Sequence, residues 1–163
     1  MNEISISPYR ETDQAAVIGL LNAVAAEVPY SYPIDAAEFA ETVLTPATAP
    51  PLYPARLEHD PAGILVGRTD DQALGFVHVC RGLAPEGTDE TLRQRGIVRF
   101  LAFAPGRIDL GLRLLAAAEA YARASGLTRM VAWHHSAGYP FYHAGVGLLS
   151  GRNYDSLSAL IEG

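Results

Sequence analysis

The chain is poor in cysteine, because Cys80 is the only one among 163 residues. No disulfide can therefore form within the chain, a cysteine-rich metal site is excluded, and the sequence assigns no metal ligands. A reducing cytoplasm is the expected environment. Long apolar runs are also lacking, since none approaches the ~20 residues that span a bilayer. Residues 1–5 lack the basic flank and apolar core of a signal peptide, so we expect no association with a membrane.

Positive charge is scarce as well: 12 Lys and Arg residues stand against 18 Asp and Glu residues, giving a formal net charge of −6. Phosphate contacts need a basic face, so this balance argues against nucleic acid as a partner. Hydrophobic residues make up 49% of the chain and charged residues 18%, as is typical of a globular protein. The length predicts one domain over 1–163 with a buried core.

The first third of the chain predicts a strand, two helices and a connection. Alternating apolar and polar residues over 3–7 indicate a short strand. Apolar residues at helical spacing follow over 12–26, and Asp35 is placed to cap a second helix over 35–44. The proline-rich segment 45–62 is expected to be irregular.

The middle of the chain predicts three strands. Two apolar runs, at 63–68 and 73–81, flank a short polar turn and are expected to form a hairpin. A third strand is expected over 96–103. The pattern therefore predicts an α/β protein.

The strongest helix signal begins after Pro105 and Gly106 and ends at Gly126, a residue suited to the left-handed conformation that follows a helix. Its apolar stripe is predicted to contain Ile108, Leu112, Leu115 and Ala122. A strand over 129–134 completes a β-α-β unit with the strand before the helix. A last helix is expected over 154–162.

The turn 104–111 is the clearest candidate for a binding site. The first amides of a helix lack partners within it, and the helix dipole is positive there, so an anion can bind. Gly106 and Gly111 allow a close approach to the backbone, and Arg107 adds a positive charge. Asp109 would repel a phosphate unless it caps the helix. An ordinary strand–helix connection remains the alternative interpretation.

The order of these elements resembles the GNAT acetyltransferase superfamily. The resemblance is carried by Arg10-Glu11-Thr12-Asp13, by the hairpin from Ile64 to Val79, by Phe103-Ala104-Pro105, and by Gly111 with Leu114 to Ala120. It implies a mixed, mostly antiparallel sheet flanked by helices, which holds acetyl-CoA between a strand and a helix N-terminus.

The resemblance also implies which residues hold acetyl-CoA. The family signature is Gln/Arg-x-x-Gly-x-Gly/Ala; with Gly111 as its last position, Gly106 and Asp109 replace the Gln/Arg and the first glycine. Amides near Ala102 and Phe103 are expected to polarise the thioester carbonyl. The expected cofactor contacts are Leu101, Ala102, Phe103, Gly106, Arg107, Ile108, Asp109, Leu110 and Gly111.

The usual acid of the family is a tyrosine on its last helix, in Phe/Leu-Tyr-x-x-x-Gly-Phe. Phe141-Tyr142 resembles the start of this motif, but Val146 then takes the place of the glycine. Shifting by one residue matches Gly145 and places Phe141, which has no proton to donate, at the tyrosine position. A third register puts the last helix at 154–162, again without a proton donor.

Three groups of candidate site residues follow. Tyr142 or Tyr139 is expected to protonate the leaving thiolate. His134, at the end of a strand, is a candidate proton relay because the pKa of histidine lies near neutrality. Tyr30 and Tyr32 lie where the acceptor loop of the family lies, and are candidate substrate contacts.

The expected function is acetyl-CoA-dependent N-acetyl transfer to a small-molecule or peptide amine. The alternative is a catalytically inactive acyl-CoA-binding or structural domain. The third register would place the last two strands of the family beyond Gly163, a pattern that resembles one half of tandem acetyltransferases such as mycothiol synthase relatives. The apolar edge of strand 129–134 is then expected to be covered, by segment 138–150, by a second domain, or by the partner of a homodimer.

Overall fold

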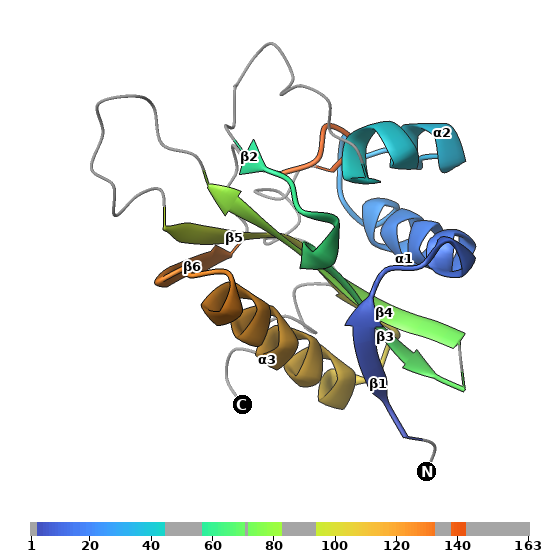
Figure 1. The fold of residues 1–163 in the computed structure, drawn as a ribbon. Coiled ribbons are helices and arrows are strands. Elements are labelled where there is room, and N and C mark those ends of the chain that lie inside the picture. Colours follow the sequence, from blue (N-terminus) through green and yellow to red (C-terminus); the bar gives the residue numbers. More distant parts are fainter. Residues whose placement is uncertain (1–2, 45–56, 71, 83–93, 133–137, 143–163) are drawn as a thin grey trace.

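The computed structural model describes residues 3–44, 57–70, 72–82, 94–132 and 138–142. A single sheet runs through the molecule with helices on both faces (Figure 1). The elements in chain order are β1 (Ser5–Pro8), the 3-10 turn η1 (Glu11–Asp13), α1 (Gln14–Ala25), α2 (Ala36–Phe39), the π-helical η2 (Ala40–Leu44), β2 (Leu57–Glu58), the 3-10 turn η3 (Pro61–Gly63), β3 (Ile64–Thr69), β4 (Gln72–Gly82), β5 (Arg95–Phe103), α3 (Ile108–Ala124) and β6 (Arg129–Ala132). The α/β class predicted from the sequence is confirmed.

The strand order is β1-β3-β4-β5-β6, and every pair is antiparallel except β5 with β6, which are parallel. The mixed, mostly antiparallel sheet and the β-α-β unit around α3 are thus as expected. The expectation for segment 45–62 is wrong in part, since Leu57–Glu58 forms β2 and η3 begins at Pro61. The reason is tertiary: β4 extends far enough for Arg81 and Gly82 to pair with β2.

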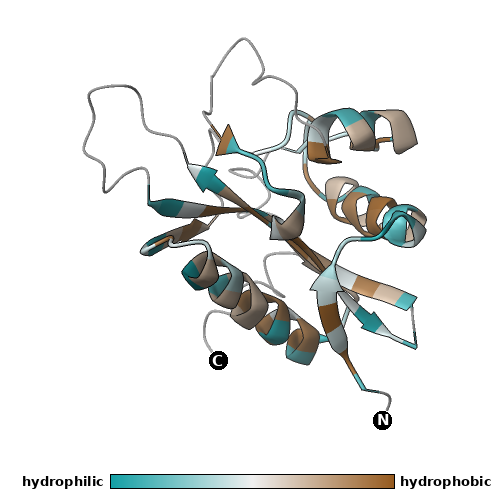
Figure 2. Ribbon diagram, in the orientation of Figure 1, coloured by the Kyte–Doolittle hydropathy of each residue, from teal (hydrophilic) through white to brown (hydrophobic). Residues whose placement is uncertain are grey.

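Two apolar clusters lie on opposite faces of the sheet, and the strands show apolar residues where they pass between the layers (Figure 2). On β4, Phe76 belongs to the cluster beneath α1 and α2, while Val77 and Val79 belong to the cluster beneath α3. The short segment 138–142 adds its aromatic rings to the α1 and α2 side. The period-2 alternation of strands therefore separates the two layers.

The buried stripe of α3 differs from the predicted one. Leu110, Leu114, Ala118 and Ala122 are buried, four residues apart along the helix. Ile108 and Leu112, expected to be buried, are 37% and 47% exposed. The prediction was right for Ala122 and wrong for Ile108 and Leu112, because both stripes are apolar and the sheet beneath the helix decides which of them is covered.

A pair of strand glycines explains how the start of α3 reaches the sheet. Gly67 on β3 lies opposite Gly75 on β4. A Cβ atom at Gly67 would lie 2.4 Å from Leu110 Cδ1, and one at Gly75 would lie 3.0 Å from Leu114 Cδ1. The missing side chains therefore let the first turns of α3 seat on the sheet, which fixes the position of the turn before it.

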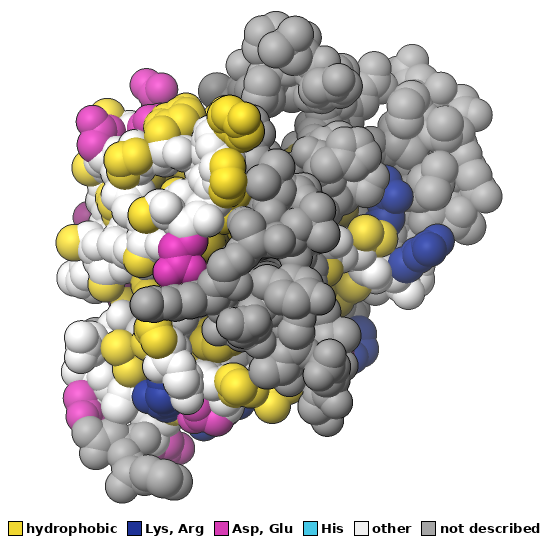
Figure 3. Space-filling model, turned by 180° about the vertical axis from the view of Figure 1, so that it is seen from behind, with side chains coloured by type: hydrophobic (Ala, Val, Ile, Leu, Met, Phe, Trp, Pro, Cys, Tyr) yellow, Lys and Arg dark blue, Asp and Glu magenta, His cyan; other side chains and the backbone are white. Residues whose placement is uncertain are grey.

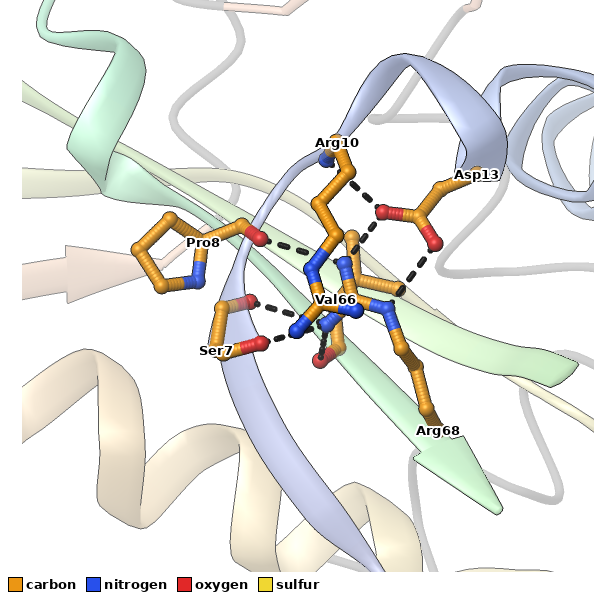
Figure 4. Close-up of polar contacts among 6 residues, drawn as sticks. All are labelled: Ser7, Pro8, Arg10, Asp13, Val66 and Arg68. Carbon is orange, nitrogen blue, oxygen red and sulfur yellow. Dashed lines mark hydrogen bonds and ion pairs between the residues drawn. The ribbon is translucent and has the colours of Figure 1, made fainter. Parts of the chain in front are cut away.

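Asp13 and Arg68 form a buried ion pair, and their side chains are only 3% and 2% exposed (Figure 4). Arg68 Nε donates to Asp13 Oδ1 at 2.8 Å, and a second guanidinium nitrogen contacts Asp13 Oδ2. The remaining guanidinium hydrogens reach Ser7 Oγ at 2.6 Å, Val66 O at 3.2 Å and Pro8 O at 3.1 Å. The pair joins β1, β3 and the entry to α1.

The carboxylate of Asp13 is held charged. Burial alone would raise its pKa, but hydrogen bonds from the Arg68 side chain and the Arg10 amide, with the charge of Arg68, outweigh burial and lower it. Asp13 Oδ2 accepts from the Arg10 amide at 2.8 Å, which closes the entry turn. The segment Arg10-Glu11-Thr12-Asp13 singled out in the sequence thus has a defined role in the fold.

β6 lies at the end of the strand order and, within the described ranges, pairs with β5 alone. Most of segment 138–150 and all of the expected helix over 154–162 lie outside the described residues, so the covering of this edge stays a prediction. In the part of the chain that is described, no helix is long and apolar enough to cross a membrane. Over the described surface in Figure 3, basic side chains lie in separate places rather than in one continuous patch.

Candidate functional site

The turn between β5 and α3 exposes the first amides of the helix. Gly106 takes a positive φ of 78°, and the Arg107 amide donates to Ala104 O at 3.1 Å, which closes the turn. The Arg107 carbonyl then accepts from the amides of Leu110 and Gly111 at 3.0 and 3.1 Å. Among the described residues, the amides of Ile108 and Asp109 have no main-chain acceptor. The Ile108 amide points ahead of the helix, where an anion can bind, while the Asp109 amide also bonds to the carboxylate of Asp109.

The charged residues of this turn pair with each other. Arg107 Nε lies 3.0 Å from Asp109 Oδ1, and Arg107 NH2 lies 3.1 Å from Asp109 Oδ2. The hydrogen bond from Arg107 lowers the pKa of Asp109, while the bond to Asp109 raises the pKa of Arg107. Arg107, rather than Asp109, occupies the N-cap position, and its side chain makes no capping bond. The positive charge expected at the turn is therefore partly neutralised by Asp109.

Among the described strands, β5 is paired on only one side next to this turn. It pairs with β4 from Arg95 to Phe103, but with β6 only from Arg95 to Val98. A bulge in the pairing with β4 follows Val98, with Arg99 as the additional residue. From there on, no described strand pairs with the β6 side of β5. A ligand lying along this edge can bond to the backbone.

The alternation of a strand identifies the amides on the open edge. The Ala104 amide donates to Leu74 O of β4 at 2.7 Å. Successive amides of a strand point to opposite sides, so Ala102 also directs its amide to β4, whereas Leu101 and Phe103 direct theirs to the open edge. Leu101 and Phe103 are thus the expected contacts best placed to donate to a ligand.

The two candidate acids lie close to the bulge. Tyr139 and Tyr142 are 3% and 7% exposed. The Tyr142 ring meets Phe100 edge-on, with 4.9 Å between the ring centroids. Tyr139 Oη lies 2.6 Å from His78 Nδ1, and the Arg99 guanidinium lies 4.3 Å above the Tyr139 ring. Burial raises the pKa of Tyr139, so this phenol keeps its proton. His134 lies outside the described residues.

The two tyrosines of the expected acceptor loop differ in their surroundings. Tyr32 is 44% exposed; its hydroxyl donates to Glu38 Oε1 at 2.8 Å, and its amide donates to Phe141 O at 3.2 Å. The hydrogen bond to Glu38 raises the pKa of Tyr32. Tyr30 is 85% exposed. The loop thus runs beside the segment that carries Tyr142, since Tyr32 bonds to Phe141, the residue before the candidate acid.

No role was predicted for His59, His78, Cys80 or Arg99, which gather on the α1 side of the sheet near Tyr139. One signal could have indicated the bulge: Arg99 interrupts an otherwise apolar run in a strand. The gathering itself depends on contacts between β4 and the segment before η3, which no local pattern reveals.

Solved structures of acetyltransferases share this fold. A GNAT family acetyltransferase from Brucella melitensis, in complex with acetyl-CoA, aligns with a TM-score of 0.59 and 17% identity over 82% of this chain and 77% of that one. A ribosomal-protein-alanine N-acetyltransferase from the same organism aligns with a TM-score of 0.52 and 18% identity over 78% and 72% of the two chains. The aminoglycoside N-acetyltransferase AAC(6')-Iy, in complex with CoA, aligns with a TM-score of 0.56 and 16% identity over 81% and 77%.

No family profile matches the chain, and no curated protein sequence matches it either. At these identities the structural likeness establishes the fold. The chain has the GNAT fold that the sequence pattern led us to expect.

Proposed function

We propose that this chain, which has the GNAT fold, is an acetyl-CoA-dependent N-acetyltransferase that acts on a small-molecule or peptide amine. One observation carries the proposal: the edge of β5 that opens after Val98 runs directly into the exposed amides at the start of α3. An open strand edge can hold an amide-rich chain, and the helix start can hold a pyrophosphate. Acetyl-CoA contains both parts in this order.

Each residue of the site is assigned a binding role from its position. Helix-start amides at Ile108 and Asp109 would bind the pyrophosphate, and the Gly106 turn would let it approach. The amides of Leu101 and Phe103 would donate to the carbonyl groups of the bound chain. Phe103 lies three positions after Phe100, or ~10 Å along the strand. Tyr142, which packs on Phe100, therefore lies well away from the pyrophosphate end. Bound acetyl-CoA supplies the acetyl thioester.

Residues of the aromatic segment 138–142 would carry out the proton transfer. Tyr142 Oη would give a proton to the leaving sulfur, and an attacking amine must first lose its own proton to water or to His134. We place Tyr142 ahead of Tyr139 because Phe141-Tyr142 resembles the start of the family motif that carries the acid. Tyr32, with its ring beside Phe141, would line the acceptor side.

A non-catalytic acyl-CoA-binding domain is the second candidate, and one observation favours it. Asp109 stands where the family signature has a glycine, and its carboxylate neutralises Arg107 next to the expected pyrophosphate. An assay of thiol release from acetyl-CoA with a panel of amines, including aminoglycosides and peptide N-termini, separates the two candidates. Amine-dependent thiol release supports the enzyme. Binding without any release supports the non-catalytic domain.

Asp109→Asn should tighten the binding of CoA about two- to five-fold, because it removes a negative charge from the first turn of a helix and releases Arg107. The gain should shrink as salt is added, since exposed charges are screened. Calorimetric titration at low and high salt measures both effects.

Glu119→Gln is the matched control. It removes the same charge from the same helix, at an exposed residue paired with Arg123 far from the turn. Equal affinities for CoA in the Asp109→Asn variant, the Glu119→Gln variant and the wild type would contradict the placement of the pyrophosphate at this turn.

A further inference from the structure

Two histidines and the only cysteine of the chain come together on the α1 side of the sheet. His59 lies just before η3, and His78 and Cys80 lie two residues apart on β4. One potential ligand atom of each residue lies within 4.8 Å of the others. Cys80 Sγ is 3.2 Å from His78 Nε2, and the rings of His59 and His78 meet edge-on with centroids 5.3 Å apart.

The hydrogen bonds of His78 prepare one nitrogen as a ligand. Its Nδ1 lies 2.6 Å from Tyr139 Oη. When Nδ1 carries the proton and donates to this oxygen, Nε2 keeps a lone pair that faces the Cys80 thiol. Metal-bound histidines commonly make such a bond through the second nitrogen, which fixes the orientation of the ring. Burial lowers the pKa of His78, so the ring is neutral, as a ligand must be.

His59 supplies a second free lone pair. Both of its ring nitrogens are buried atoms with no hydrogen-bond partner in the described part of the chain. Burial lowers the pKa of this histidine, although the Leu44 carbonyl near the ring acts in the opposite direction. A buried polar group without a partner is costly, so it calls for an explanation. A bound ion would give one of these nitrogens its partner.

We propose that His59, His78 and Cys80 bind a divalent cation of the zinc class. Two imidazole nitrogens and a thiolate are ligands that zinc prefers, and the ligand atoms need to approach to ~3.5 Å of one another to surround it tetrahedrally. The Cys80 proton leaves as the metal–sulfur bond forms, so each ion bound releases one proton to solvent. A fourth position is left for water.

The neighbouring charges act on the site in opposite directions. Burial raises the pKa of the Cys80 thiol to about 11, while the charge of Arg99 and its hydrogen bond to the sulfur act in the opposite direction. The positive charge of Arg99 also opposes a cation. Asp60 adds negative charge next to His59 while its carboxylate accepts from Ala62 and Tyr121. The ion would tie the segment before η3 to β4 and, through Tyr139, to the aromatic segment. The inference does not depend on acetyl transfer.

The test is titration of the tag-free full chain, stripped with a chelator and desalted, with Co²⁺ and then with Zn²⁺. Cobalt should give a thiolate-to-metal charge-transfer band that saturates at one ion per chain. Zinc should abolish this band and raise the melting temperature, since an ion that binds only the folded state stabilises it. Failure of both metals to bind the folded protein stoichiometrically overturns the proposal.

Variants decide which residues hold the ion. Cys80→Ser should remove the charge-transfer band, and His59→Gln should weaken zinc binding at least about 10-fold. Glu119→Gln changes an exposed residue of α3 that pairs with Arg123, and this variant should bind the ion as the wild type does. If the Cys80→Ser and His59→Gln variants both bind zinc as tightly as the wild type does, the proposed site is refuted. His59 is half-buried, so its variant decides the result alone if Cys80→Ser does not fold.

Discussion

Arg68→Met is expected to lower the free energy of unfolding by about 3–5 kcal/mol, because it leaves the Asp13 carboxylate buried without its cation. The lost guanidinium also bonds to Ser7, Pro8 and Val66 (Figure 4), so β1 loses an attachment to β3. Urea unfolding followed by circular dichroism measures the loss.

Two controls separate the buried charge from other effects. The double variant Asp13→Leu with Arg68→Met removes both charges and should recover much of the loss, because no charge then stays buried alone. Arg123→Met breaks the exposed pair with Glu119 and should cost no more than about 1 kcal/mol. A loss below about 1 kcal/mol in Arg68→Met itself would contradict the role given to the pair.

The acid-side loss of stability of the Arg68→Met variant should be smaller than that of the wild type. In the wild type the pKa of Asp13 is lower folded than unfolded, so its stabilisation is present above the unfolded pKa and is lost as pH falls through the folded pKa. Without Arg68, burial is opposed only by the hydrogen bond from the Arg10 amide and by the charge of Arg10, so the pKa of Asp13 rises from its wild-type value. The variant should then lose less stability than the wild type as pH falls, which unfolding curves at several pH values would show.

Tyr142→Phe is expected to lower kcat about 10²- to 10⁴-fold, the usual contribution of a positioned acid, while KM for acetyl-CoA changes little. The phenyl ring keeps the contact with Phe100, so the fold should survive. Steady-state kinetics with the best amine of the panel measures both constants.

Tyr139→Phe is the matched comparison, because it removes the other buried hydroxyl of the same segment. Loss of its bond to His78 should cost about 1 kcal/mol of stability, with a much smaller effect on kcat. The opposite result, a large loss of kcat in Tyr139→Phe alone, would transfer the role of acid to Tyr139.

The helix α3 shows how far the sequence could determine the fold. Its start after Gly106, its end before Gly126 and the parallel strand that follows were all predicted from local signals. The buried side of α3 was not predicted correctly, because Leu110 and Leu112 are equally apolar. The choice between them depends on Gly67 and Gly75, which leave room in the sheet beneath Leu110 and Leu114.

One part of the candidate site could likewise be predicted from the sequence, and the other parts could not. The turn 104–111 could be found from glycines between a strand and a helix, because helix-start amides are a property of local backbone. The amides on the open edge of β5 could not be identified from the sequence, because their direction depends on the pairing with β4. The grouping of His59 with Cys80 likewise needs a contact across 21 positions of the chain that only the folded structure provides.

The proposal that the open edge of β5 and the start of α3 hold acetyl-CoA is tested most directly by calorimetric titration of the full chain. Acetyl-CoA should bind one per chain with a Kd on the order of 10 µM, within the usual range for enzyme substrates. S-acetyl-pantetheine, which lacks the pyrophosphate and the nucleotide, should bind far more weakly. No heat of binding and no change in melting temperature at millimolar acetyl-CoA would contradict the proposal, as would equal affinity for the two compounds.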